Sequence, residues 1–333
     1  LIYGIRSSGN QTTVGFNLLA DFVLAHPELH QADLGAIVLK FRAYMDDLLS
    51  SHDTAEEAAR AAQELKYVLS LGSMGVKDIT FNGSSPSELV STDEVHVGLL
   101  GMLWDSKNDV IKLDIGELYL GKRKRGKNPE IIEDDLPGKL SKQFTRRVVV
   151  GKVASVYDPL GLLTPVTAKY KLQLHDLCGK KLDWDDKIPG EFLDTWVTNI
   201  EEIQTLGSIQ FPRSVIPPDA ANLKISYIIS SDASEEIAIC SVHSRILKTD
   251  GTYHVQLVTA KSKIITNLTV PRAELKGMVM GATLGHCIRR CTEDRLDEVV
   301  HVTDSAICLY WLKQDQRPLQ TGVRNAVLEI RRL

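Results

Sequence analysis

Two adjacent carboxylates follow an apolar segment in the first part of the chain. The motif Tyr44-Met45-Asp46-Asp47 lies within residues 34–49, which we expect to form a strand, a tight polar turn and a second strand. Adjacent acids at a rigid turn repel each other, and a divalent cation relieves that repulsion. Asp46 and Asp47 therefore suit two-metal phosphoryl transfer. Asp-Asp is also common in solvated turns, and the local pattern leaves that alternative open.

A second set of acids is spread over the last third of the chain. Asp232 ends an expected strand, Glu274 lies near the start of an expected helix, and Asp304 ends another strand. Acids in these places can converge on one edge of a sheet and hold a metal ion there. Capping is the alternative, because helix N-termini favour acids without any metal.

The elements that must position Asp46 and Asp47 follow from hydropathy and turn residues. A helix is expected to begin with Asp53 as its N-cap, with Glu56 completing a capping box, and to end at Gly72. The remaining expected segments are short strands at Asp78–Phe81 and Val95–Trp104, an exposed loop at 121–139, a helical Leu-rich stretch to about Gly179, and a linker at Phe211–Asp219.

From Lys224 onward the pattern becomes rich in β-strand residues. The expected elements are strands at Ile225–Ser231, Ile237–Leu247 and His254–Ser262, a helix at Arg272–Arg290, a strand at Glu298–Thr303 and a helix after Asp304. Three strands, a helix, a strand and a helix predict an α/β (α+β) domain.

Composition sets limits on the class of protein. The 333 residues are 43% apolar and 25% charged, which is ordinary for a globular chain. No segment approaches the roughly eighteen apolar residues of a membrane helix, so we expect no membrane association. The five cysteines are scattered and odd in number, which argues against a disulfide scaffold and indicates a reducing compartment.

Charge is distributed unevenly along the chain. The net charge of −4 counts against an obligate nucleic-acid binder. However, residues 112–152 carry eleven Lys or Arg against six Asp or Glu, a net +5, and such a segment can track phosphates.

Other candidate sites carry less weight. His286, Cys287 and Cys291 are close together, but no fourth ligand has zinc-like spacing. The acidic run Leu182–Asp186 is better explained as a solvated loop. Asp53-Thr54-Ala55 opens a polar helix and does not fit an aspartic protease, and the chain has no Walker-type phosphate loop.

The order of the motifs resembles the pol polyprotein of Bel/Pao-type LTR retrotransposons. In the first part, these are the segment from Tyr3 to Gln11 (YGIRSSGNQ), the YMDD motif and Val97–Trp104; in the middle, SVYDPLGLLTPV at 155–166 and LDWDD at 182–186; in the last part, SDASE at 231–235, LVTAKS at 257–262, PRAEL at 271–275 and TDS at 303–305. Part of this region is also known by a Pao "peptidase" name, although its residues give no support for proteolysis.

The resemblance implies a fold in three parts: a partial reverse-transcriptase palm (1–105), a thumb and connection region (106–222) and a ribonuclease H-like domain (223–333). It implies that Asp46 and Asp47 hold Mg²⁺ for RNA-directed DNA synthesis. Asp232, Glu274 and Asp304 would hold Mg²⁺, with Mn²⁺ as the alternative, to hydrolyse RNA in RNA–DNA hybrids. The implied partners are an RNA template, a DNA primer, the hybrid and deoxynucleotide triphosphates.

Two departures from the family pattern qualify that expectation. The family's polymerase site uses a further Asp upstream of the YGIRSSGN segment, and its ribonuclease H uses a fourth acid beyond the last helix, so we expect both sites to be truncated here. The alternative is therefore an inactive or domesticated remnant that binds nucleic acid or a protein partner. The resemblance also implies an intracellular location, in cytoplasmic virus-like particles or in the nucleus.

Overall fold

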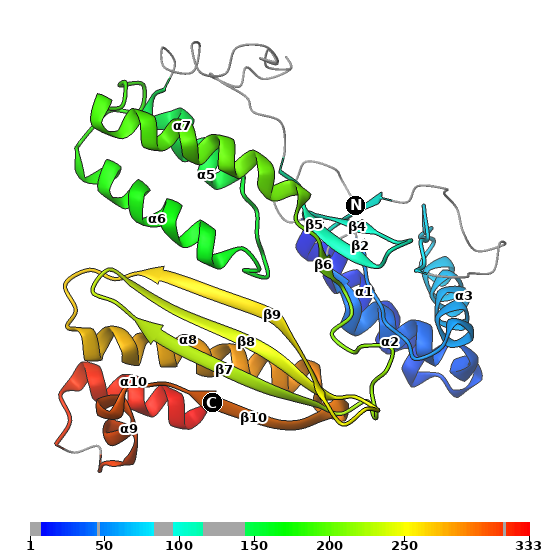
Figure 1. Ribbon diagram of the computed structural model, residues 1–333. Coiled ribbons are helices and arrows are strands. Elements are labelled where there is room, and N and C mark those ends of the chain that lie inside the picture. Colours follow the sequence, from blue (N-terminus) through cyan, green and yellow to red (C-terminus); the bar gives the residue numbers. More distant parts are fainter. Residues whose placement is uncertain (1–7, 45–46, 83–95, 116–143, 316–317) are drawn as a thin grey trace. The chain divides into compact units, whose positions relative to one another are not determined.

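The computed structural model describes residues 8–44, 47–82, 96–115, 144–315 and 318–333 (Figure 1). The chain divides into two compact units, Leu1–Lys112 and Leu113–Leu333. The predicted three-part division, with boundaries after residues 105 and 222, stays a prediction. The basic loop expected at 121–139 and most of the YGIRSSGN segment lie outside the described residues.

The first unit is built mainly from helices that share one apolar core. Its elements are α1 (Ser8–Ala25), η1 (Pro27–Ala32), α2 (Asp33–Arg42), β1 (Ala43–Tyr44), β2 (Asp47–Leu48), α3 (Ala55–Leu71), β3 (His96–Leu99) and β4 (Met102–Asp105), with β5 (Val110–Leu113) at the boundary. The core consists of α1, α2 and α3 side chains such as Val23, Leu39 and Val68, all fully buried.

The strand predicted before the YMDD motif is wrong, because residues 33–42 form α2. Gly35, Ala36, Val38 and Leu39 are buried, which is the spacing of one helix face rather than of a strand. A Cβ at position 35 would lie 2.4 Å from the backbone carbon of Glu64, so α2 and α3 pack almost backbone to backbone there. Tertiary packing thus overrides the local β-strand pattern.

Two smaller predictions in this unit also need correction. Thr54, not Asp53, is the N-cap of α3, and its side chain accepts a hydrogen bond from the Glu57 backbone N–H at 3.1 Å. The segment 78–81 contains no strand. The strand predicted at Val95–Trp104 is a hairpin of β3 and β4, since Leu100 and Gly101 both take positive φ, as a tight hairpin turn requires.

The second unit begins with three helices that pack together. They are α5 (Arg146–Ser155), α6 (Thr164–Gly179) and α7 (Gly190–Thr205), followed by η2 (Leu206–Ser208) and β6 (Phe211–Pro212). Trp196 and Ile200 of α7 are fully buried against Val149 of α5 and Leu177 of α6. The predicted helical stretch up to Gly179 is therefore confirmed as two helices joined by the SVYDPLGLL loop.

The rest of the second unit is a mixed four-stranded sheet with helices, which confirms the predicted α/β (α+β) class. Its elements are β7 (Ile225–Ala233), β8 (Ile237–Leu247), β9 (Tyr253–Ile264), α8 (Val270–Cys291), η3 (Glu293–Arg295), β10 (Leu296–Val302), α9 (Ala306–Lys313) and α10 (Thr321–Arg332). The strand order is β10-β7-β8-β9, with β10 parallel to β7 and the other pairs antiparallel.

Helix α8 lies along one face of this sheet (Figure 1). The apolar side chains of β7 and β8 on that face, including Ile229 and Val242, are buried under it. On its other side, α8 packs Leu275 and Met278 against Cys308, Val323 and Val327 of α9 and α10. Among the described residues, no helix has both the length and the apolar character needed to cross a membrane.

Candidate functional site

The ends of β7 and β10 bring two of the predicted acids to one edge of the sheet. Their parallel pairing ends with Val302 opposite Ser230. Asp232 and Asp304 each lie two residues beyond that last pair. Because paired strands are about 4.8 Å apart, Asp232, the second-last residue of β7, and Asp304, just after β10, lie near each other at the same end of the sheet. Both side chains are exposed.

Glycines let α8 approach this edge closely. A Cβ at Gly277 would lie 3.2 Å from the Asp232 backbone oxygen and 3.4 Å from that of Ile239. One turn further along, a Cβ at Gly281 would lie 3.0 Å from the Ile229 side chain. Glu274 is one turn before Gly277, or about 4.5 Å along the helix axis, so it lies toward the edge that carries the acids.

A hydrogen bond joins Glu274 to the residue that follows Asp304. The Ser305 hydroxyl donates to Glu274 Oε2 at 2.5 Å. The same hydroxyl accepts from the Cys308 backbone N–H at 3.3 Å, which makes Ser305 the N-cap of α9. Ser305 is buried and Glu274 is half-buried, so this contact fixes the distance between α8 and the end of β10.

The three acids therefore share an edge, but their carboxylates do not form a ligand set in the structure. Asp232 Oδ1 accepts the backbone N–H of its neighbour Ala233 at 2.7 Å. Within the described residues, no group of three or more His, Cys, Asp or Glu is arranged to hold a metal ion. None of the three acids forms an ion pair with a described residue.

The second predicted acid pair is only partly described. Asp47 begins β2 and is paired with Tyr44 of β1, which confirms a hairpin at the YMDD motif. Asp46 lies outside the described residues. Tyr44 is 60% exposed and Asp47 is half-buried, so the hairpin lies at the surface of the first unit.

The LDWDD block at 182–186 holds α5 in place. Arg147 donates to both oxygens of Asp185, at 2.9 and 3.2 Å, and its backbone N–H donates to the Trp184 carbonyl. The guanidinium groups of Arg146 and Arg147 lie over the Trp184 ring. Sequence reasoning described this block as a solvated loop and missed the contact, although paired arginines and an acidic-aromatic run were the available signal.

The middle and last parts of the chain are similar to a known protein family. Residues 145–305 match the family described as the Pao retrotransposon-like RNaseH-like domain. No curated protein matches the chain. An RNase H-like domain supports nucleic-acid hydrolysis as the general class of activity, and such domains generally use divalent metals.

Solved structures show fainter likenesses. A foamy viral protease-reverse transcriptase in complex with double-stranded DNA is 14% identical at a TM-score of 0.44, over 92% of this chain and 47% of that one. The same viral protein in complex with an RNA/DNA hybrid is 12% identical, with a TM-score of 0.41, over 89% of this chain and 35% of that chain. RNase H1 of the archaeon Halobacterium salinarum NRC-1 is 14% identical, with a TM-score of 0.22, over 33% of this chain and 75% of that chain.

With TM-scores below 0.5, these structural likenesses establish neither mechanism nor substrate. This chain spans about half of the first foamy viral chain. The match over residues 145–305 includes the SVYDPLGLL, LDWDD, SDAS and PRAEL motifs and ends with the last residue of TDS. That match confirms the predicted resemblance of this chain to a Bel/Pao-type retrotransposon pol region.

Proposed function

We propose that the second unit is a ribonuclease H that cleaves the RNA strand of RNA–DNA hybrids, with Asp232, Glu274 and Asp304 as its metal ligands. The observation that supports this most is the position of the three acids. Asp232 and Asp304 each lie two residues beyond the last β7–β10 pair, and Glu274 is tied to Ser305. Carboxylates from separate elements near one end of a sheet are the oxygen donors that a divalent cation takes.

The donor set fits a hard divalent cation. All three side chains offer carboxylate oxygens, which Mg²⁺ and Mn²⁺ prefer, and no described cation pairs with them. The metal would stabilise the attacking and leaving oxygens of a phosphodiester. Asp232 and Asp304 are exposed, and the hydrogen bond from the Ala233 N–H occupies one of the two Asp232 oxygens. Ser305 donates to Glu274 Oε2 and leaves the other carboxylate oxygen, Oε1, for the metal.

We infer that the first unit served RNA-directed DNA synthesis in the intact protein. The paired strands at the YMDD motif place Asp47 on a surface hairpin, as a metal ligand beside a nucleic-acid groove would be. In this proposal Asp46 and Asp47 hold Mg²⁺, and the partners are an RNA template, a DNA primer and deoxynucleotide triphosphates. The compartment remains the one inferred from the sequence, a virus-like particle or the nucleus.

Cleavage of a labelled RNA annealed to DNA tests the nuclease proposal. We expect Mg²⁺- or Mn²⁺-dependent cleavage that falls at least about a hundredfold, or 2.7 kcal/mol in the barrier, in each of Asp232→Asn, Glu274→Gln and Asp304→Asn. Asp194→Asn is the matched control, since Asp194 is exposed on α7, away from this edge.

Two outcomes would reject the nuclease. One is cleavage that is equally fast in all three variants, which would assign the activity to a contaminant or to another site. The other is hybrid binding without metal-dependent cleavage in any preparation, which would favour the alternative of a remnant that binds nucleic acid without catalysis.

A further inference from the structure

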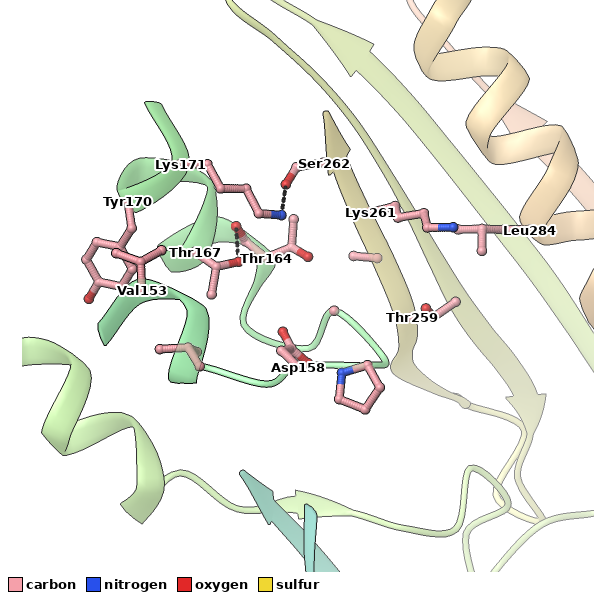
Figure 2. A pocket seen from close by; sticks show the side chains of 14 residues that line it. Val153, Asp158, Thr164, Thr167, Tyr170, Lys171, Thr259, Lys261, Ser262 and Leu284 are labelled. Atoms are coloured by element: carbon pink, nitrogen blue, oxygen red, sulfur yellow. Dashed lines mark hydrogen bonds between the residues drawn. The ribbon is translucent and has the colours of Figure 1, made fainter. Parts of the chain in front are cut away.

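The helices of the second unit are joined to its sheet by polar contacts, whereas the first unit leaves an apolar surface exposed. Where the SVYDPLGLL loop and α6 meet β9, a cavity of about 380 Å³ remains (Figure 2). The Leu160 carbonyl accepts the Ala260 backbone N–H at 2.9 Å and the Thr259 hydroxyl at 2.6 Å. Lys171 donates to the Ser262 hydroxyl at 3.0 Å. These bonds explain the cavity as a junction within the fold, and the apolar surface of the first unit needs a different explanation.

Helix α1 exposes an apolar stripe on the side that faces away from the core of the first unit. On its core side, Ala20 and Val23 are fully buried. Val14, Leu18 and Phe22 follow one another at intervals of four residues, so they lie on one face of the helix, and each is at least 50% exposed. Helices at a protein surface normally present polar and charged residues on that side. The stripe is therefore typical of a helix that is covered on both sides.

Charge beside this stripe is neutralised within the first unit. Asp21 is the one charged residue among the 18 residues of α1, and it pairs with Lys40 of α2 at 2.6 Å. Phe41 lies beside this pair, because Lys40 Nζ is 5.4 Å from the centre of its ring, and it is 65% exposed. Ile37, one turn earlier on α2, is also exposed. The term α1–α2 patch is used below for Val14, Leu18, Phe22, Ile37 and Phe41.

The size of the α1–α2 patch fits a reversible interface between proteins. Phe22 and Phe41 expose half or more of their surface, and burial of such a side chain covers about 150–250 Å². The five residues together expose roughly 500 Å² of apolar surface, within the range of about 300–600 Å² for the largest and often functional patch of a monomer. Two such patches in contact bury roughly 1,000 Å², which is about the lower limit for a specific interface.

Antiparallel contact between two copies of α1 matches the stripe to itself. Because Val14 and Phe22 are each four residues from Leu18, a two-fold axis at Leu18 places Val14 of one copy against Phe22 of the other. The smaller side chain thus meets the larger, and Leu18 meets its own copy. The same register puts Asp21 opposite Gly15, where an added Cβ would find nothing within 4 Å. The charged residue therefore meets open space and not an apolar side chain.

We propose that the α1–α2 patch joins two copies of this chain, with the two α1 helices antiparallel about a two-fold axis at Leu18. The pattern favours a second copy as the occupant, because the stripe is symmetric about Leu18. A charged partner is not favoured, since Asp21 is already paired with Lys40 and offers it no free counter-charge. The dimer does not depend on the proposed nuclease, whose acids lie in the second unit.

Sedimentation velocity of the full chain over a range of concentrations tests this proposal. We expect a reversible monomer–dimer equilibrium in the wild type. Leu18→Glu should weaken dimerisation at least about tenfold, because it brings two carboxylates together at the axis. Leu328→Glu is the matched control and should dimerise as the wild type does, since Leu328 is an exposed leucine of α10 in the second unit. Far-UV circular dichroism of each variant checks that it is folded.

A pair of opposite charges tests the antiparallel register. Val14→Lys and Phe22→Glu should each weaken the dimer, whereas the double variant should restore it, because each lysine then faces a glutamate of the other copy. Residues eight positions apart on one helix are not neighbours, so the recovery would come from contact between copies. Recovery in the double variant also separates loss of the interface from loss of folding in the single variants.

Four results would overturn the proposal. One is a wild-type chain that stays monomeric at every concentration up to its solubility limit. Another is equal dimerisation of the wild type and Leu18→Glu, which would place the interface elsewhere. Equal weakening in Leu328→Glu, or association without a limiting size, would indicate non-specific contact between apolar surfaces. A double variant that dimerises no better than its single variants would reject the antiparallel register, and the proposal with it.

Discussion

The hydroxyl of Ser305 donates a 2.5 Å hydrogen bond to Glu274, and the two residues come from different elements of the second unit. Because Ser305 directly follows Asp304 and also caps α9, its side chain connects the first turns of α8 to the end of β10 and to the start of α9. The positions of two proposed metal ligands therefore depend on a residue that would not touch the metal.

Replacing this serine should lower both stability and metal affinity. Ser305→Ala removes the N-cap of α9 and leaves Glu274 without its donor, so we expect the free energy of unfolding to fall by about 1–2 kcal/mol. Urea unfolding with and without Mn²⁺ measures this. Ser208→Ala is a control, since the Ser208 hydroxyl donates only to the nearby Thr205 carbonyl. An equal loss in both variants would contradict the role given to Ser305.

The close approach of α8 to the sheet makes Gly277 intolerant of a side chain. Gly277→Ala places a methyl group 3.2 Å from the Asp232 carbonyl, and we expect about 1–3 kcal/mol of destabilisation. Gly151 is the matched control, because it is a helical glycine with nothing within 4 Å of its Cβ. Gly151→Ala should stabilise the chain by up to about 1 kcal/mol through helix propensity. Thermal unfolding measures both variants. If the two substitutions changed the melting temperature in the same direction, the packing argument would be contradicted.

The β-rich part was predictable because its signal is local. Alternation of apolar residues predicted β7, β8 and β9 to within two residues of their ends. The expected strand ends also predicted that Asp232 and Asp304 lie at the ends of β7 and β10. The contact between Glu274 and Ser305 was not predictable, since it depends on how closely α8 approaches the sheet. That distance is set by Gly277 and Gly281 against backbone and side-chain atoms far away in sequence.

The segment before the YMDD motif shows where local pattern fails. Ile37 and Val38 are β-branched, and a short apolar run there fits a strand or a buried helix equally well. Close packing of Gly35 on α3 decides for the helix. The family motif SVYDPLGLL was visible in the sequence, but its contact with Ala260 crosses about a hundred residues and leaves no local pattern.

The turn at Gly161 should tolerate no side chain, because it lies in close contact with Ala260. Gly161→Ala combines a positive φ with a Cβ 1.8 Å from a carbonyl oxygen, and we expect more than about 3 kcal/mol of destabilisation or failure to fold. Gly251 has a similar φ of +82° but open space around its Cβ, so Gly251→Ala isolates the backbone strain of about 1 kcal/mol. Similar unfolding midpoints for the two variants would show that the contact with β9 contributes nothing.

The cysteines should divide into two classes of reactivity. Burial raises the pKa of the Cys240 thiol to about 11, and burial also raises the pKa of Cys308. Cys178, Cys287 and Cys291 are exposed. At pH 8, an aromatic disulfide reagent should modify these three rapidly in the native chain and all five after unfolding, because the thiolate is the reactive form.

The same pKa shift predicts a loss of stability at high pH. In the unfolded chain the Cys240 thiol ionises near its ordinary pKa of 9.0, whereas in the folded chain it stays protonated up to about 11. The folded state thus binds more protons between these values, so its contribution is complete below pH 9 and declines as the pH rises toward 11. In Cys240→Ala, the urea concentration at the unfolding midpoint should change less with pH over this range. An unchanged pH profile would show that the thiol is not the group responsible.

Titration with Mn²⁺, followed by the loss of its free electron-spin resonance signal, tests the central claim most directly. The account predicts saturable binding to the whole chain that weakens at least about tenfold, or 1.4 kcal/mol, in each of Asp232→Asn, Glu274→Gln and Asp304→Asn. Asp194→Asn should bind as wild type does. If the three variants bound Mn²⁺ as tightly as the control, the acids at the end of β7 and β10 would not be a metal site, and the proposed nuclease would lose its active centre.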